Sequence, residues 1–432
     1  MTELTMAQRR RDSIDRAEKR LKRRRRAEAR FRLYGLLAVA TALGFLAVLI
    51  SMIVVNSIPA FTQTVIGLEV DFDPETIDPN GNADPSVLAR ADYGGLIKAA
   101  LRETFPEVTG RKEKRLLYSL VTNGAQYDLA KKVTADTALI GTRQKVWVAA
   151  SDRADQLYSR IDRDDVATRG DDETLLGWLR ELQRKGDIVS RFNTTFFTSG
   201  DSREPEQAGI LGAIVGSGLT LLVTFLCSFP LGVLAALYLE EFAPKSRWTN
   251  LIEVNINNLA AVPSIIFGLL GLAVFLNFFG MPRSAPLVGG LVLSLMTLPT
   301  IIIAARAALK AVPPSIREAA LALGASPLQV AVHHTLPLAA PGILTGTIIG
   351  MAGALGETAP LLMIGMVAFI VDIPAAVTDP AAVLPVQIYL WADSPERGFA
   401  AKTNAAILVL LGFLILMNLL AVLLRRRFER RW

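Results

Sequence analysis

The sequence predicts a polytopic α-helical membrane protein with six transmembrane helices and a small α+β extracytoplasmic domain between the first two. Apolar residues make up 51% of the 432 residues. They are concentrated in long uninterrupted blocks, and a block of about 20 apolar residues is enough to cross a bilayer. Clusters of arginine flank the first and the last of these blocks. This arrangement indicates an even number of crossings with both ends on the same side.

Each predicted span follows from one apolar run. The six runs cover residues 33–57, 209–239, 256–279, 286–308, 341–370 and 404–424. The first run is longer than the 7–15-residue core of a signal peptide, and no small-residue cleavage site follows it. We therefore expect 33–57 to be a membrane anchor, and 209–424 to form a five-helix core.

Basic residues predict the orientation. Residues 1–32 form a basic N-terminus that includes Lys22–Arg26, and residues 425–432 form a basic tail. Because positively charged flanks stay in the cytoplasm, we expect both termini there and the chain in a bacterial inner membrane. Basic termini also occur in nucleic-acid-binding proteins. A charge run directly beside a membrane span is more typical of a topology signal, so no nucleic-acid partner is predicted.

Residues 58–208 differ in composition from the rest of the chain and are predicted to form an extracytoplasmic domain. They are charged and rich in turns, as in Asp78–Asn82. Apolar spacing predicts helices over 95–101 and 174–182, and alternation predicts a strand over 144–150. The sequence does not indicate what this domain binds.

No metal site is predicted in this domain. It contains neither cysteine nor histidine, which excludes a disulfide framework and a Cys/His zinc site. Acids cluster between Asp162 and Glu173, but arginines are interleaved and the spacing differs from that of a calcium-binding EF-hand loop. We interpret the cluster as a solvated face.

The loop 311–338 between two predicted spans carries the most specific pattern. Ser315 and Glu318 stand at capping-box spacing, and Gly324 suits a left-handed helix end. Ser326–Gln329 repeats the start signal. Two short helices joined at Gly324 follow. Since spans tether both ends, entry into a DNA groove is excluded, which leaves a docking element for a cytoplasmic protein or an amphipathic connection on the bilayer.

A resemblance favours docking. The pattern Glu318-Ala319-Ala320, Gly324 and Leu336-Pro337 resembles the coupling loop of ATP-binding-cassette (ABC) importer permeases, with His334 at a position that is usually aliphatic. The resemblance implies that Glu318, Ala319, Ala320 and Gly324 contact a cytoplasmic ATPase.

The next span resembles one family within this superfamily. Gly356–Leu362 is similar to a segment of phosphate-specific permeases, and the chain as a whole resembles a PstA-type subgroup with a large N-terminal extracytoplasmic insertion. Gly353 stands where many members have arginine. The implied partners are a cytoplasmic ABC ATPase dimer, a second homologous permease subunit and an extracytoplasmic phosphate-binding protein. Transport of another oxyanion remains an alternative.

Glu357 is the main candidate for a functional residue within the membrane. A carboxylate there is costly unless it faces protein or water, so a transport role and a structural hydrogen bond are both open. Hydroxyl groups suit a phosphate path, and the candidates are Thr358, Ser294, Thr297 and Thr300. Glycines at every fourth position, Gly342, Gly346 and Gly350, predict close helix packing. Arg306 is predicted to snorkel to the inner interface with Lys310.

The sequence does not predict an enzyme. It has no Gly-x-x-x-x-Gly-Lys-Ser/Thr phosphate loop and no nucleophile elbow, so no cofactor is expected and a partner must hydrolyse ATP. A membrane sensor with residues 59–208 as its receptor is a third hypothesis. We would expect a cytoplasmic signalling domain in such a sensor, and the sequence shows no such domain.

Overall fold

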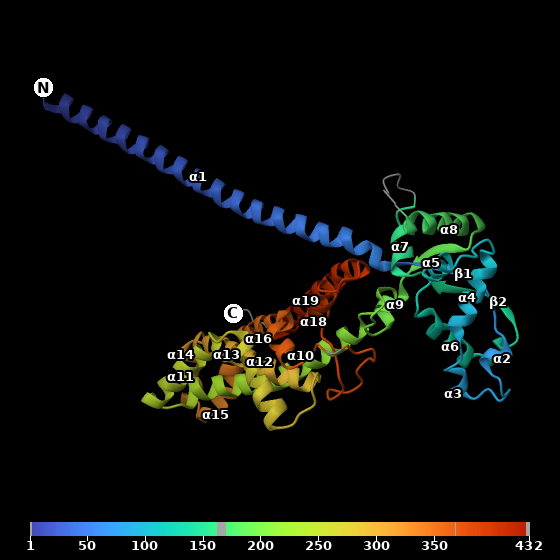
Figure 1. Cartoon of the computed structure of the whole chain (residues 1–432). Coiled ribbons are helices and arrows are strands. Elements are labelled where there is room, and N and C mark those ends of the chain that lie inside the picture. Colours follow the sequence, from blue (N-terminus) through green and yellow to red (C-terminus); the bar gives the residue numbers. More distant parts are fainter. Residues whose placement is uncertain (1, 162–169, 368, 429–432) are drawn as a thin grey trace. The chain divides into compact units, whose positions relative to one another are not determined.

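The computed structural model describes residues 2–161, 170–367 and 369–428 (Figure 1). The chain divides into two compact units, Met1–Asn56 and Ser57–Trp432. The acids predicted to form a solvated face at 162–165, and the end of the predicted basic tail at 429–432, lie outside the described residues.

The first unit is one helix. α1 runs from Thr2 to Ser57, and its part from Arg23 onward, together with the turn of 3-10 helix η1 (Ile58–Phe61), is long and apolar enough to cross a membrane. The predicted span 33–57 is the C-terminal part of α1. The basic N-terminal segment continues the same helix, as expected for lysine, arginine, glutamate and alanine, which are all good helix formers.

The segment between the first two apolar helices has a three-stranded antiparallel sheet. Its strands are β1 (Thr62–Asp71), β2 (Arg143–Ala149) and β3 (Ile188–Phe192), in the order β2-β1-β3. The predicted strand at 144–150 corresponds to β2. The predicted helices at 95–101 and 174–182 lie within α4 (Tyr93–Thr104) and α8 (Asp171–Lys185).

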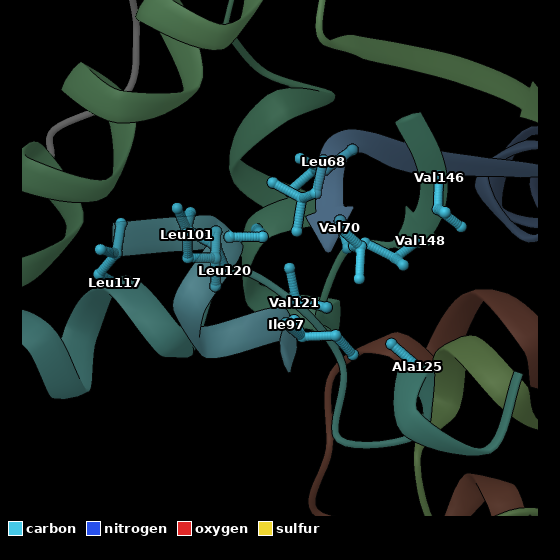
Figure 2. Packing of buried hydrophobic residues seen from close by; sticks show 14 of the residues in the cluster. Leu68, Val70, Ile97, Leu101, Leu117, Leu120, Val121, Ala125, Val146 and Val148 are labelled. Atoms are coloured by element: carbon cyan, nitrogen blue, oxygen red, sulfur yellow. The ribbon is translucent and has the colours of Figure 1, made fainter. Parts of the chain in front are cut away.

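One face of this sheet is buried. Along β1 the side chains of Ile66, Leu68 and Val70 are all fully buried, as period-two alternation requires. Figure 2 shows Leu68 and Val70 among residues of α4, α5 (Arg111–Tyr118) and β2. The same segment has further short helices: α2 (Pro74–Ile77), α3 (Pro85–Leu88), α6 (Ala125–Ala135), η2 (Thr137–Leu139), α7 (Asp152–Tyr158), α9 (Thr194–Thr198) and η3 (Pro205–Gln207). Phe196 of α9 packs in a separate cluster with residues of α10 (Leu211–Leu237), α18 (Leu384–Ala392) and α19 (Gly398–Phe428).

The remaining chain forms a bundle of long apolar helices. α10 (Leu211–Leu237) packs on α13 (Pro286–Lys310), α13 on α16 (Leu336–Gly356), and α16 on α19 (Gly398–Phe428) (Figure 1). With α1, five helices in the described part of the chain can cross a membrane by length and composition, and one bent pair can supply a sixth crossing.

The prediction of one continuous helix over 256–279 is wrong. The structure has α11 (Arg247–Ala260), then α12 (Ser264–Gly271) continued by the π-helix η5 (Leu272–Phe278), with a bend of 99° between the pair. Pro263 at the break lacks an N–H donor and disfavours helical geometry in the residue before it. The segment is therefore a broken span or a re-entrant loop.

The predicted spans at 341–370 and 404–424 also have different limits. α16 begins at Leu336 and ends at Gly356, and only the short α17 (Ala359–Met363) follows before α18 (Leu384–Ala392). The backbone of Glu357 is extended, so α16 ends there, and Pro360 is the second residue of α17. The last helix begins at Gly398, six residues before the predicted start at 404. Residues 398–403, which are not all apolar, form its first turns.

Candidate functional site

Two short helices form the loop between α13 and α16, as predicted. They are α14 (Pro314–Ala322) and α15 (Pro327–Gln329), and the π-helix η6 (Val330–Thr335) leads into α16. The capping box at Ser326 and Gln329 is present, with the Ser326 N–H donating to Gln329 Oε1 at 2.8 Å. The box predicted at Ser315 and Glu318 is absent, because Pro313 is the N-cap and Ser315 already lies within the helix.

Gly324 ends α14 in the predicted left-handed conformation, with φ of +87°. Its N–H donates to the Leu321 carbonyl at 2.9 Å, and the Ala325 N–H donates to the Ala320 carbonyl at 3.1 Å. These two bonds make a Schellman motif, which satisfies the last carbonyls of the helix. A side chain at 324 would strain this turn even though no atom lies within 4 Å of an added Cβ.

The surface of this loop is apolar and uncovered in the chain. Leu323 is 90% exposed, and Leu321 and Leu328 are also exposed. Glu318 and Ala319 share the exposed side, whereas Ala320 is buried inside the loop. A cluster of exposed leucines on a well-capped rigid loop is typical of a protein contact surface. We call Leu321, Leu323 and Leu328 the leucine surface.

An ion pair holds α14 to the end of α10. The guanidinium of Arg317 donates to both carboxylate oxygens of Glu241, with its shortest contact at 2.8 Å, and also to the carbonyls of Leu309 and Val312. Glu241 lies in the π-helix η4 (Tyr238–Phe242) that extends α10. The side chains are 22% and 12% exposed. These bonds join α14 to the ends of α10 and α13, and we call this pair the Arg317–Glu241 latch.

A second ionic cluster lies on the same side. Arg306 contacts Glu253 at 2.6 Å and Glu240 at 3.6 Å, and Lys310 reaches Glu240 at 3.7 Å. Arg306 is only 14% exposed and shares Glu240 with Lys310, and its snorkelling to the inner interface stays a prediction. Sequence reasoning missed Glu240, Glu241 and Glu253. Two adjacent acids directly after an apolar run were the available signal, because acids there need basic partners.

Two of the three predicted packing glycines lie tightly against α13. A Cβ added at Gly346 would overlap the Cβ of Ala304, and one at Gly342 would lie 2.6 Å from the Cβ of Ala308. At Gly350 the nearest atom would be 3.7 Å away, which is ordinary contact. The close approach of α13 and α16 thus depends on Gly342 and Gly346.

Glu357 stands at the C-terminal end of the 21-residue helix α16. At about 1.5 Å per residue, it lies roughly 30 Å from the start of α16. Its side chain is half-buried and has no hydrogen bond or ion pair within the described ranges. Ile349 (63% exposed) and Gly353 are exposed on the same helix, eight and four residues before Glu357 respectively. This face of α16 is uncovered in the single chain.

The predicted path hydroxyls divide into two groups. Ser294 and Thr297 are buried and donate to carbonyls of their own helix, at Leu291 and Ser294 respectively, whereas Thr300 and Thr358 are partly exposed. The four residues do not form one bonded cluster in the structure. Sequence reasoning missed a buried hydroxyl row on α10, made by Thr220, Thr224 and Ser228. Its spacing of four residues was the available signal.

The two broken helices meet one another. α12, which follows the break at Pro263, packs against α17, which follows the break at Glu357. A Cβ added at Gly268 would lie 2.7 Å from Cα of Pro360, so this contact needs glycine. Irregular backbone at membrane depth occurs where it is buried in protein or lines a cavity. The neighbourhood of these breaks is the candidate translocation path.

Comparison with known proteins gives two matching families. Residues 18–166 match a family described as a domain of unknown function (DUF3333). Residues 228–432 match the family described as the binding-protein-dependent transport system inner membrane component.

Individual relatives match part of the chain. The phosphate transport system permease protein PstA of Yersinia pestis is 35% identical over 214 residues, covering 49% of this chain and 71% of that protein. The probable ABC transporter permease protein YqgI of Bacillus subtilis is 34% identical over 175 residues, which span 40% of this chain and 59% of that protein's length. A solved inward-facing MetNI methionine ABC transporter aligns over 50% of this chain and 96% of its own, with TM-score 0.41 and 19% identity.

Proposed function

The chain belongs to the family of PstA-type phosphate ABC transporter permeases, and from this premise we propose that it is the membrane subunit of an ATP-driven phosphate importer. It is a multi-pass membrane protein of the permease class and not an enzyme. The observation that carries the proposal is the leucine surface, presented on a capped loop that the Arg317–Glu241 latch ties to α10. Such a subunit needs a separate ATPase to bind this loop.

The contacts proposed for the ATPase dimer are the leucine surface together with Glu318, Ala319 and Gly324. These residues are exposed, whereas Ala320 supports the loop from inside. Closure of the ATPase would push α14, and the latch would pass this movement to α10 and α13. This arrangement requires both termini and the loop 311–338 to be cytoplasmic, with residues 58–208 on the opposite side, as the basic flanks predict.

The uncovered face of α16 is the proposed contact with a second permease subunit. Ile349, Gly353 and Glu357 lie along it, and Gly353 leaves room for a partner helix. The substrate path would then run between the two subunits, beside the helix breaks at Pro263 and Glu357. An extracytoplasmic phosphate-binding protein would deliver the anion to the outer end of this path.

Electrostatics argue against direct contact between Glu357 and phosphate. At an effective dielectric constant of about 20, a unit negative charge 5 Å from a charge of −2 costs roughly 6–7 kcal/mol. Glu357 therefore acts on the arrangement of the helix break, and the hydroxyls of Thr300 and Thr358, which are both partly exposed, are better placed to meet the anion.

The proposed function predicts phosphate-dependent ATP hydrolysis. The chain, reconstituted in liposomes with its second permease, its ATPase and a phosphate-loaded binding protein, should hydrolyse ATP at least about tenfold faster than without the loaded binding protein. Phosphate release and uptake of labelled phosphate are the measurements. Sulfate with a sulfate-binding protein is the matched control.

Stimulation by sulfate but not by phosphate would replace the proposed substrate with another oxyanion, which is the alternative that Gly353 keeps open. If the chain failed to assemble with any ATPase, the permease role itself would be contradicted.

Substitutions at Glu357 distinguish a role in hydrogen bonding from a role that requires its negative charge. Glu357→Gln keeps shape and hydrogen bonding, so it should transport nearly normally if Glu357 bonds to the partner permease. Glu357→Leu removes both properties and should lose uptake at least about tenfold. Failure of both variants would show that charge is required. Normal uptake by Glu357→Leu, at equal membrane abundance, would eliminate Glu357 as a functional residue.

A further inference from the structure

A buried lysine lies near the start of the last apolar helix. Lys402 is in the second turn of α19 and is only 4% exposed. Its ammonium donates to the carbonyl of Ala208 and lies 5.7 Å from the centre of the Phe196 ring. A lysine is almost never fully buried unless it is paired, because removing the charge from water is costly. Its surroundings must therefore supply negative charge.

Four carboxylates provide that charge, and none of them comes from the helices of the bundle. Asp152 and Asp155 are on α7, and Asp201 and Glu206 are in the segment that joins the 58–208 domain to α10. Glu206 is 8% exposed, and its Oε2 has no hydrogen-bond partner among the described residues. The negative charge of the nearby Glu204 also raises the pKa of Glu206. The negative charges of these four carboxylates thus act on one buried ammonium; Glu206 is itself buried, whereas the three aspartates are half-buried.

The carboxylates also bond to three separate parts of the fold. Asp155 accepts the Thr64 N–H of β1 at 3.0 Å, Asp201 accepts the indole N–H of Trp391 on α18 at 2.9 Å, and Asp152 accepts the Gly398 N–H at the start of α19 at 3.2 Å. A Cβ at Gly398 would overlap the carboxylate of Asp152. The cluster therefore joins the domain to α18 and α19.

Burial affects the protonation of these acids. It raises the pKa of Asp155, of Asp201 and of Glu206, although hydrogen bonds and, for the two aspartates, Lys402 oppose the increase. An acid whose pKa is raised in the assembled cluster stabilises the assembly below its ordinary pKa, and this contribution is lost as pH rises through the raised value. These three acids should thus contribute more stability to the joined arrangement at acidic pH than above their raised pKa values.

We propose that Lys402 is a positioning residue that fastens the 58–208 domain to the start of α19 through a buried cluster holding an exchangeable proton. The exchangeable ligand in this proposal is the proton, which the carboxyl groups of Asp155, Asp201 and Glu206 can each take up or release. Proton uptake from the extracytoplasmic side would tighten the attachment, and proton release would loosen it. The inference concerns the domain and does not depend on the transported anion.

Trp391 provides a reporter at the cluster, because its indole N–H is bonded to Asp201 and its side chain is 3% exposed. The experiment uses the full-length chain in lipid nanodiscs, with the other four tryptophans, Trp147, Trp178, Trp248 and Trp432, changed to Phe. The fluorescence of Trp391 is then measured from about pH 4 to pH 9. We expect one reversible transition in emission.

Variants assign that transition to the cluster. Lys402→Met removes the positive charge that favours ionised carboxylates, so the midpoint should move up by about one pH unit or more. Lys402→Arg keeps the charge and should stay near the parent. Glu206→Gln should shift or shrink the transition. Arg397→Met, at an exposed cation five residues before Lys402, is the matched control and should change nothing.

Hydrogen exchange tests the fastening separately. The Gly398 N–H is bonded to Asp152 across the attachment, so its exchange should be at least about tenfold faster in Lys402→Met than in Arg397→Met. A parent chain whose Trp391 emission does not change with pH would overturn the proposal, and this result does not require any variant to fold. A transition that Lys402→Met and Glu206→Gln leave unmoved would also overturn it.

Discussion

Arg317→Met is expected to reduce phosphate uptake at least about tenfold, a loss equivalent to ~1.4 kcal/mol in the coupled step. The substitution leaves the carboxylate of Glu241, 12% exposed, without its partner, and it releases the carbonyls of Leu309 and Val312. Breaking a largely buried ion pair by removing one partner costs about 3–5 kcal/mol. α14 should then move without α10, so ATP hydrolysis continues while uptake falls. The measurement is the ratio of uptake to ATPase rate.

A second change separates the latch from a general loss of stability. Glu241→Gln, added to Arg317→Met, removes the unpaired charge and should recover part of the uptake. The effects of substitutions at the two residues of one ion pair are not additive. Arg247→Met, an exposed cation at the start of α11, is the control. Leu323→Asp on the leucine surface should instead lose ATPase binding. The latch would not transmit the movement if Arg317→Met kept the normal ratio of uptake to ATPase rate. The same would follow if the double variant showed no more uptake than Arg317→Met alone.

The sequence allowed the local features of the coupling loop to be predicted, because they depend on neighbouring residues. The capping box at Ser326 and Gln329 and the left-handed Gly324 need only a few consecutive positions to be recognised. The same reasoning failed at Ser315, since Pro313-Pro314 sets the helix start two residues earlier. Two start signals overlapped there, and the proline signal was the correct one.

Helix breaks within apolar runs were harder to predict. Hydropathy measures only the transfer of side chains into lipid, and both 256–279 and 341–370 pass that test. The breaks depend on Pro263 and on Glu357 together with Pro360, and proline in a membrane helix is often tolerated as a kink. α12 and α17 pack against one another after their breaks. Packing between distant segments is not visible in a single run.

The ionic contacts were missed for a related reason. Arg317 and Glu241 are 76 residues apart, and Lys402 and Ala208 are 194 apart. Arg306 is likewise far along the chain from Glu240 and Glu253, which are its partners in the structure. Sequence spacing does not select these partners, because the contacts between the helices do so.

Gly346→Ala is expected to destabilise the bundle by ~1–3 kcal/mol, the usual cost of inserting a carbon into a filled interface. The new methyl would overlap Cβ of Ala304, and the helices α13 and α16 would have to separate to admit it. In a membrane, helix association depends on such close packing because lipid provides no hydrophobic drive between helices. Thermal unfolding of the purified protein in nanodiscs should therefore begin at a lower temperature.

The size of the effect should follow the available space along α16. Gly342→Ala, whose methyl would lie 2.6 Å from Cβ of Ala308, should cost less than Gly346→Ala. Gly350→Ala should be neutral or stabilising by up to ~1 kcal/mol, since its nearest neighbour would be at 3.7 Å and alanine is the better helix former. Ala304→Gly, combined with Gly346→Ala, transfers the methyl across the interface and should restore much of the loss. Equal effects at all three glycines, or no rescue by Ala304→Gly, would show that steric contact with α13 is not what glycine at 346 provides.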